Sequence, residues 1–150
     1  MMRSNQRRCA VTGVLAAALL LGACVTAPPR ASLSPELARV TLETRPQDRV
    51  EAYRLDGDLV DGLRFDDLTP GAHELRIRHH FETMGSASGG LLGEPQWERC
   101  ILAVRYGGFR GGEHYTLETE RRGFRSVGWL NSSQGEKLAD ARIIRCGPGV

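Results

Sequence analysis

The chain has 150 residues, with 20 lysines and arginines against 18 aspartates and glutamates, and its net charge is +2. This length suits one domain that buries roughly two-thirds of its unfolded surface. Arg3, Arg7 and Arg8 precede an apolar segment that we expect to be removed, and without them the net charge becomes −1. Such a domain lacks the basic charge on which nucleic-acid binding depends, so no nucleic-acid partner is expected.

Residues 1–23 have the composition of a secretory signal peptide. Three arginines and no acidic residue stand before residues 10–23, which are apolar or small apart from Thr12. A basic start, a short apolar run and small residues at the cleavage point are typical of such signals. This apolar run is too short to remain as a membrane helix, which takes roughly 20 residues.

Leu21, Gly22, Ala23 and Cys24 end the run and resemble the bacterial lipoprotein signal, in which a leucine and two small residues precede a cysteine. The resemblance implies cleavage between Ala23 and Cys24, and lipidation of Cys24. Two or three acyl chains would hold the protein firmly on the membrane, whereas a single chain binds reversibly. Val25 stands where an aspartate signals inner-membrane retention in enterobacterial lipoproteins, so the resemblance implies the outer membrane, facing the periplasm. The alternative is an ordinary signal with a chance cysteine.

The remaining cysteines indicate one disulfide. Cys9 leaves with the signal and Cys24 takes the lipid, so Cys100 and Cys146 remain as an even pair in an oxidising compartment. Closing this loop would stabilise the fold by about 4 kcal/mol in the chain-entropy model. Two separate buried thiols are the alternative, and a redox role is not expected without a Cys-Xaa-Xaa-Cys arrangement.

Residues 24–37 are expected to form the lipidated cysteine and a proline-containing tether. Pro28 and Pro29 lie among small and polar residues, which favours a semi-extended segment. At about 3.3 Å per residue, residues 25–35 could hold the domain some 30 Å from the bilayer at most. Residues 34–37 could begin a short helical turn or a loop.

Alternating apolar residues predict a series of short strands. The clearest covers residues 74–82, where odd-numbered positions from Leu75 to Phe81 face one way. Residues 100–106 are apolar at both sets of positions, as in a central strand covered on both faces. The full set of expected strands is 40–44, 50–55, 74–82, 100–106, 115–119, 124–130 and 138–146. Residues 135–141 could instead form one or two helical turns.

These strands, separated by glycine and aspartate turns, predict an all-β protein. Short strands with frequent turns and no long helical periodicity favour a single β-sandwich, immunoglobulin-like or transthyretin-like, over residues 38–147.

Two local resemblances support this fold. Leu55-Asp56-Gly57, Phe65 and residues 68–77 resemble the PEGA-type repeat of bacterial surface proteins, although His79-His80-Phe81 replaces its terminal Gly-Tyr. The later part of the chain, from residues 112–115 through residues 127–130, resembles small proteobacterial envelope lipoproteins of unassigned function. Both resemblances imply a β-sandwich in the envelope, and neither supplies a catalytic residue.

No metal site or cofactor is expected. The histidines are His73, His79, His80 and His114, and adjacent His79 and His80 point to opposite faces of a strand. We expect His73 to hydrogen-bond in a turn and His79 to be a buried polar group with a partner.

Catalysis is not expected either. The chain has no Gly-Xaa-Ser-Xaa-Gly elbow, and Ser86 and Ser88 lie in a glycine-rich loop that would hold reacting groups poorly. Asp66 and Asp67 lie in an expected turn and are expected to be solvated.

The best candidate partner contacts are on two loops. The loop over residues 85–97 is long for a hairpin and holds Leu91, Leu92 and Trp97. Phe109 and Arg110 are expected at the tip of a second, glycine-flanked hairpin. For each loop the alternative is a plain connection without a partner.

These features leave two functional hypotheses. The first is a structural or protein-interaction accessory of an envelope complex. The second is a binding module for cell-wall glycan or another small ligand, which requires Trp97, Tyr106 and Trp129 to line one groove. A cationic cluster of Arg121, Arg122 and Arg125 could meet anionic lipid or glycan, or form a solvated face.

Overall fold

The computed structural model describes residues 30–84 and 95–147. Our expectations for the signal segment with Ala23 and Cys24, for Ser86 and Ser88, and for Leu91 and Leu92 lie outside the described residues. Ala31–Val150 forms one compact unit that contains every buried side chain described. This segment therefore has a complete hydrophobic core of its own.

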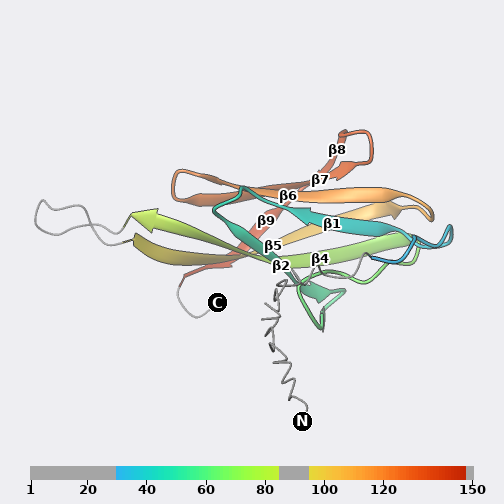
Figure 1. Ribbon diagram of the computed structural model, residues 1–150, viewed down its shortest axis with the longest axis horizontal. Coiled ribbons are helices and arrows are strands. Elements are labelled where there is room, and N and C mark those ends of the chain that lie inside the picture. The colour runs from blue at the N-terminus through green and yellow to red at the C-terminus, as the bar shows by residue number, and fades with distance from the viewer. Residues whose placement is uncertain (1–29, 85–94, 148–150) are drawn as a thin grey trace, which may run out of the picture. The chain divides into compact units, whose positions relative to one another are not determined.

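The described residues form nine strands in two sheets, which confirms the predicted all-β sandwich. The strands are β1 (Arg39–Glu43), β2 (Arg49–Leu55), β3 (Asp58–Leu59), β4 (Gly71–Met84), β5 (Pro95–Phe109), β6 (His114–Arg122), β7 (Arg125–Ser132), β8 (Lys137–Asp140) and β9 (Arg142–Cys146). The smaller sheet has the order β1-β6-β7-β8 and the larger β3-β2-β4-β5-β9. Figure 1 shows β1, β6 and β7 in one layer and β2, β4 and β5 in the other. The described residues contain no helix long and apolar enough to cross a membrane.

A long antiparallel hairpin of β4 and β5 forms the middle of the larger sheet. Its register runs from Gly71 opposite Phe109 to Met84 opposite Pro95. The predicted alternation in β4 is confirmed, because the side chains on its inner face are fully buried. These are Leu75, Ile77, His79 and Phe81.

The predicted central strand, covered on both faces, is confirmed. β5 lies between β4 and the edge strand β9, and both of its faces are buried. Leu102 and Val104 pack in the core, while Ile101 and Ala103, on the outer face, are 6% and 4% exposed.

The smaller sheet begins with a parallel pair. β1 runs parallel to β6, with Val40 opposite Tyr115, and β6 and β7 form an antiparallel hairpin. Between β1 and β6 the chain builds four strands of the larger sheet. The core lies between the sheets, where Val40, Leu117 and Leu130 of one meet Leu75 and Leu102 of the other.

The predicted strand over residues 138–146 is two strands. β8 pairs with β7 in the smaller sheet, and β9 pairs with β5 in the larger one. Ala141 alone separates them, and its amide donates to the carbonyl of Gly128 at 2.8 Å. The helical alternative for residues 135–141 is wrong, because this segment supplies a sheet edge.

The segment before β1 is fixed by one turn and one ion pair. The Leu37 amide donates to the Ser34 carbonyl at 3.1 Å. Residues 34–37 therefore form one hydrogen-bonded turn and do not begin a helix. Arg39 donates from Nε and from a terminal nitrogen to the two carboxylate oxygens of Asp67, at 2.8 and 2.7 Å. Asp67 is therefore not simply solvated as predicted, although Asp66 is exposed.

Candidate binding groove beside β7 and β9

A groove of about 570 Å³ opens where the chain crosses from the smaller to the larger sheet. We call it the β7–β9 groove. It is lined by Arg122, Arg125, Ser126, Val127, Gly128, Trp129, Lys137, Asp140, Ala141 and Ile143. Arg122 is the last residue of β6, Ala141 lies between β8 and β9, and the other lining residues belong to β7, β8 and β9.

Two strand edges border the groove. β8 covers only part of β7, since its register pairs run from Trp129 to Asn131. Gly128 accepts a hydrogen bond from Ala141, and by the alternation of an antiparallel strand Ser126 presents its backbone to the same side, beyond the end of β8. β9 pairs with β5 alone and is the last strand of its sheet. Open edges of this kind can pair with another extended chain.

The groove is lined by apolar side chains and by charged side chains, and most of the charged ones are cationic. Ile143 on β9 lines the groove and is 39% exposed, and Ile144, which follows it outside the lining, is 43% exposed. Arg122 lies with its guanidinium carbon 5.7 Å from the centroid of the Trp129 ring. Lys137 pairs with Asp140 at 2.5 Å, and Arg122 pairs with Glu120, which lies outside the lining. The lining itself holds three cationic side chains against the one carboxylate of Asp140, so its net charge is positive.

The disulfide holds the outer wall of the groove. Cys100 in β5 and Cys146 in β9 are bonded, with their Cα atoms 4.0 Å apart, which confirms the predicted pair. All five residues of β9 are exposed, so this strand contributes little to the core. Backbone pairing and the disulfide therefore attach β9 to β5.

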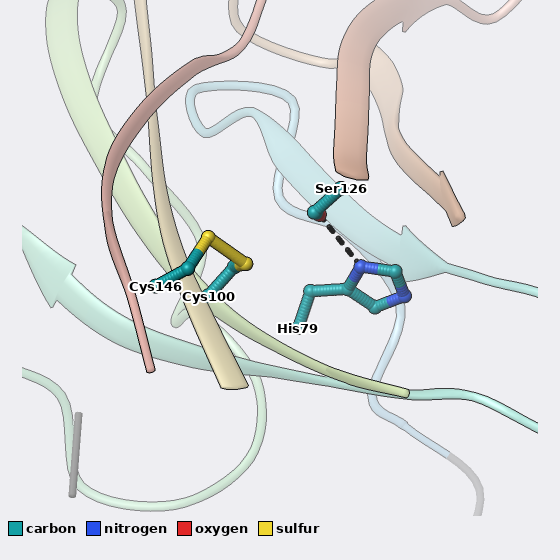
Figure 2. The surroundings of a disulfide bond; sticks show 4 residues. All are labelled: His79, Cys100, Ser126 and Cys146. Carbon is teal, nitrogen blue, oxygen red and sulfur yellow. Dashed lines mark hydrogen bonds between the residues drawn. A yellow bond between two sulfur atoms is a disulfide. The ribbon is translucent and has the colours of Figure 1, made fainter. Parts of the chain in front are cut away.

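A buried polar cluster lies behind the groove. His79 Nδ1 is hydrogen-bonded to the Ser126 hydroxyl at 2.7 Å, as Figure 2 shows beside the disulfide. His79 Nε2 lies 3.2 Å from Thr44 Oγ1 and 3.5 Å from a carboxylate oxygen of Asp48. The prediction that His79 is a buried polar group with a partner is thus confirmed. Burial lowers the pKa of His79, against the opposing effect of Asp48.

The order Asp48, His79, Ser126 has the residue types of a hydrolytic triad, but Ser126 is 0% exposed. A nucleophile must reach a substrate carbonyl beside an oxyanion site. With its hydroxyl turned inward toward His79, Ser126 fills a structural position that joins the two sheets.

His73 and His80 also have local partners. His73 Nδ1 lies 2.6 Å from the Asp56 carboxylate and its Nε2 lies 2.8 Å from the Thr69 carbonyl, which confirms its predicted turn role. Burial opposes protonation of His73, but these two partners outweigh it and raise its pKa. His80 lies 3.4 Å from Glu51. Within the described parts of the chain, no cluster of three or more candidate ligands could hold a metal ion.

The predicted contact residues are scattered. Phe109 is 2% exposed and packs against Tyr106 and Tyr115, so its predicted position at an exposed tip is wrong. The register shift between Gly71 and His73 turns the end of β5 so that Phe109 faces the core, whereas Arg110 is exposed. Trp97 belongs to β5 rather than to the expected loop, and is 64% exposed.

The three aromatic residues of the glycan hypothesis do not line one groove. Trp97 is paired with Glu82 on the outer face of the larger sheet, while Trp129 is paired with Glu118 in the smaller sheet. Tyr106 packs in the aromatic group around Phe109. Among the three, only Trp129 lines the β7–β9 groove.

The predicted cationic cluster is divided. Arg122 and Arg125 line the groove, whereas Arg121 donates to the carbonyl of Glu82 in the opposite sheet. The sequence reading missed Lys137 and Ile143, because it merged β8 and β9 into one strand. Ala141, small and flanked by Asp140 and Arg142 within that apolar run, was the available signal for a break.

Comparison with known proteins adds no family assignment: no family model, no curated protein and no solved structure matches the chain. The groove is therefore interpreted from its own geometry.

Proposed function

We propose that this chain is a lipid-anchored envelope protein, cleaved after Ala23 and lipidated on Cys24, and most consistent with the outer membrane facing the periplasm. The sequence of residues 1–24 supports the anchor. The Cys100–Cys146 disulfide agrees with an oxidising compartment, since such bonds persist outside the cytosol.

Within that setting, the sandwich acts as a protein-interaction accessory that holds an extended segment of a partner in the β7–β9 groove. The observation that supports this role is the groove itself, bordered by the edge strand β9 and by the part of β7 beyond β8. A partner segment that adds a strand to such an edge gains main-chain hydrogen bonds, and side-chain pockets give specificity. Arg122 and Arg125 favour an acidic segment, and Ile143 favours an apolar side chain within it.

We propose binding without catalysis. The buried Ser126 hydroxyl supports this choice, as does the absence of a candidate metal-ligand cluster from the described residues. The glycan-binding alternative retains one supporting feature, Trp129 with Arg122 beside its ring. One aromatic side chain offers a smaller stacking surface than that hypothesis requires.

Site-specific photocrosslinking in intact cells tests the interaction role. A photoreactive residue at Ile144, exposed on β9, is expected to capture one discrete envelope protein. The same residue at Thr41, exposed on β1 at the other end of the smaller sheet, is the matched control. Equal capture from both positions, or none from Ile144, would contradict the proposal. Replacing Arg122 and Arg125 with glutamate is expected to abolish the Ile144 crosslink.

The anchor has its own test. Intact-mass measurement should show a mature chain that begins at Cys24 and carries acyl chains, and globomycin should cause the precursor to accumulate. A precursor level unchanged by globomycin would contradict lipoprotein processing, whatever the crosslinking result.

A further inference from the structure

The outer face of the larger sheet concentrates positive charge. The register places the side chains of β2, β4, β5 and β9 that point away from the core on one surface, which we call the arginine face. It holds eight arginines against three glutamates: Arg49, Arg54, Arg76, Arg78, Arg99, Arg105, Arg142 and Arg145, with Glu51, Glu74 and Glu82. The chain as a whole is close to neutral, so its charges are sorted by face.

The arginines lie in rows across the strands. Arg54 of β2 is directly opposite Arg76 of β4. Arg76 is in turn opposite Ala103 of β5, which is opposite Arg142 of β9. Like charges directly opposite each other destabilise a sheet. The fold therefore accepts a repulsion that an anion on this surface would relieve.

The glutamates neutralise only part of the face. Glu74 pairs with Arg76 at 2.6 Å and also with Arg105, and these arginines lower its pKa. Glu51 lies 3.5 Å from Arg78. Among the described residues, the exposed side chains of Arg49, Arg142 and Arg145 have no such ion pair.

Buried apolar groups lie beneath this charged layer. Ile101 and Ala103 are almost fully buried although they lie on the outer face, which fits long arginine stems lying across them with their guanidinium groups in water. Arg78 also lies over the Tyr53 ring, at 3.9 Å from its centroid. The guanidinium groups thus lie in one layer above the sheet, over four strands that together span about 14 Å across the sheet.

We propose that the arginine face docks on the anionic headgroups of a lipid membrane. Guanidinium groups bind phosphate oxygens through paired hydrogen bonds, and the spread of the cations over four strands matches a surface of many phosphates better than one small ligand. This inference rests on the proposed function in one respect: the Cys24 anchor keeps the domain near a bilayer. Docking would set the orientation of the domain and leave the β7–β9 groove to a partner.

Vesicle cosedimentation of the oxidised fragment Ala31–Val150 tests the proposal. The fragment has the whole described core but lacks Cys24, so its binding depends on the face and not on a lipid. It is expected to sediment with vesicles of phosphatidylglycerol and phosphatidylcholine in equal parts, less so as salt is raised, and not with phosphatidylcholine alone. Soluble glycerol phosphate should not compete.

A pair of variants with the same change of net charge locates the site. Arg49→Gln with Arg145→Gln is expected to lower the partition coefficient by about tenfold or more, because each basic side chain near an anionic surface changes it severalfold. Arg122→Gln with Arg125→Gln, in the groove, should leave it within about twofold, because these side chains lie off the face. Circular dichroism checks that both variants fold.

Several results would overturn the proposal: no sedimentation with the anionic vesicles, equal binding to both kinds of vesicle, displacement by glycerol phosphate, or equal losses in the two variants. Binding of duplex DNA as tightly as of anionic vesicles would assign the face to nucleic acid instead. If vesicle binding fails while Cys24 is lipidated in cells, the docking inference falls and the proposed anchor stands. If Cys24 is not lipidated but the fragment binds the anionic vesicles, the proposed anchor falls and the docking inference stands.

Discussion

His79 and Ser126 meet inside the sandwich, with the imidazole Nδ1 2.7 Å from the hydroxyl oxygen. His79 belongs to β4 of the larger sheet and Ser126 to β7 of the smaller one, and both are fully buried. Their hydrogen bond is thus a buried polar contact between two layers whose core is mainly apolar (Figure 2).

Replacing Ser126 with alanine should destabilise the fold by about 1–3 kcal/mol, since His79 would keep a buried ring nitrogen without its partner. Urea unfolding of the oxidised protein measures this loss. Ser133→Ala, at an exposed turn position, is the control and should change the free energy of unfolding by less than about 0.5 kcal/mol. Equal effects in the two variants would show that the buried contact contributes nothing.

Stability should fall as the solution is made acidic through pH 6.5, the ordinary pKa of histidine. Burial depresses the pKa of His79, with smaller contributions from His80 and Arg121, while Asp48 opposes the shift. The unfolded chain then binds more protons than the native one, so protonation favours unfolding. Unfolding curves between about pH 7.5 and 5.5 measure the slope, which His79→Gln should reduce.

His73 supplies a control of opposite sign. Its pKa is raised by Asp56 and the Thr69 carbonyl, so its contribution is present at low pH and is lost as pH rises through the raised value. His73→Gln should therefore steepen the loss of stability on acidification. A shallower loss in His73→Gln would contradict this assignment.

Replacing Cys100 and Cys146 with alanine should lower the free energy of unfolding by about 4 kcal/mol in the chain-entropy model. The two cysteines are 46 residues apart, so the bond closes a long loop. Hydrogen exchange should accelerate most at the amides of β9, because that exposed strand loses its covalent attachment. Exchange in the β2–β4 ladder is the internal reference. Unchanged protection of β9 would refute this role of the bond.

Gly111→Ala should destabilise the protein by about 1–3 kcal/mol, because overpacking forces the backbone to move. An added Cβ would lie 2.6 Å from the Pro35 carbonyl oxygen, in the segment that leads into β1. Gly107→Ala is the matched control, since its Cβ would have no neighbour within 4 Å. Thermal unfolding compares the two, and a loss as large in Gly107→Ala would argue against the steric explanation.

Local pattern was enough to predict β4 and the buried role of His79, since period-two alternation needs only neighbouring residues. Local pattern could not predict the parallel pairing of β1 with β6, because the paired residues, such as Val40 and Tyr115, are far apart in the sequence. The break at Ala141 was missed for a related reason: an apolar run does not show that its two halves belong to different sheets.

The binding surfaces were hidden from sequence for physical reasons. The β7–β9 groove depends on how far β8 extends along β7, which is a property of the register. The near-zero net charge of the chain also gave no indication of the arginine face, because acidic residues elsewhere balance its arginines. The alternation of Arg76 and Arg78 with core residues was visible in β4, but the alignment of Arg54 and Arg142 beside them requires the paired sheet.

The position of β9 also has a consequence for biogenesis. A ribosome makes the chain from its N-terminus, so β2, β4 and β5 exist before β9 and Cys146 do. Until then, β5 has an unpaired edge and Cys100 has no sulfur to join. Unpaired edges in incomplete chains are a route to aggregation. For the exported chain proposed above, which crosses the membrane from its N-terminus, the vulnerable interval lies between the passage of Phe109 and that of Cys146. A chaperone on the far side of the membrane that covers the edge of β5 would protect the chain during this interval.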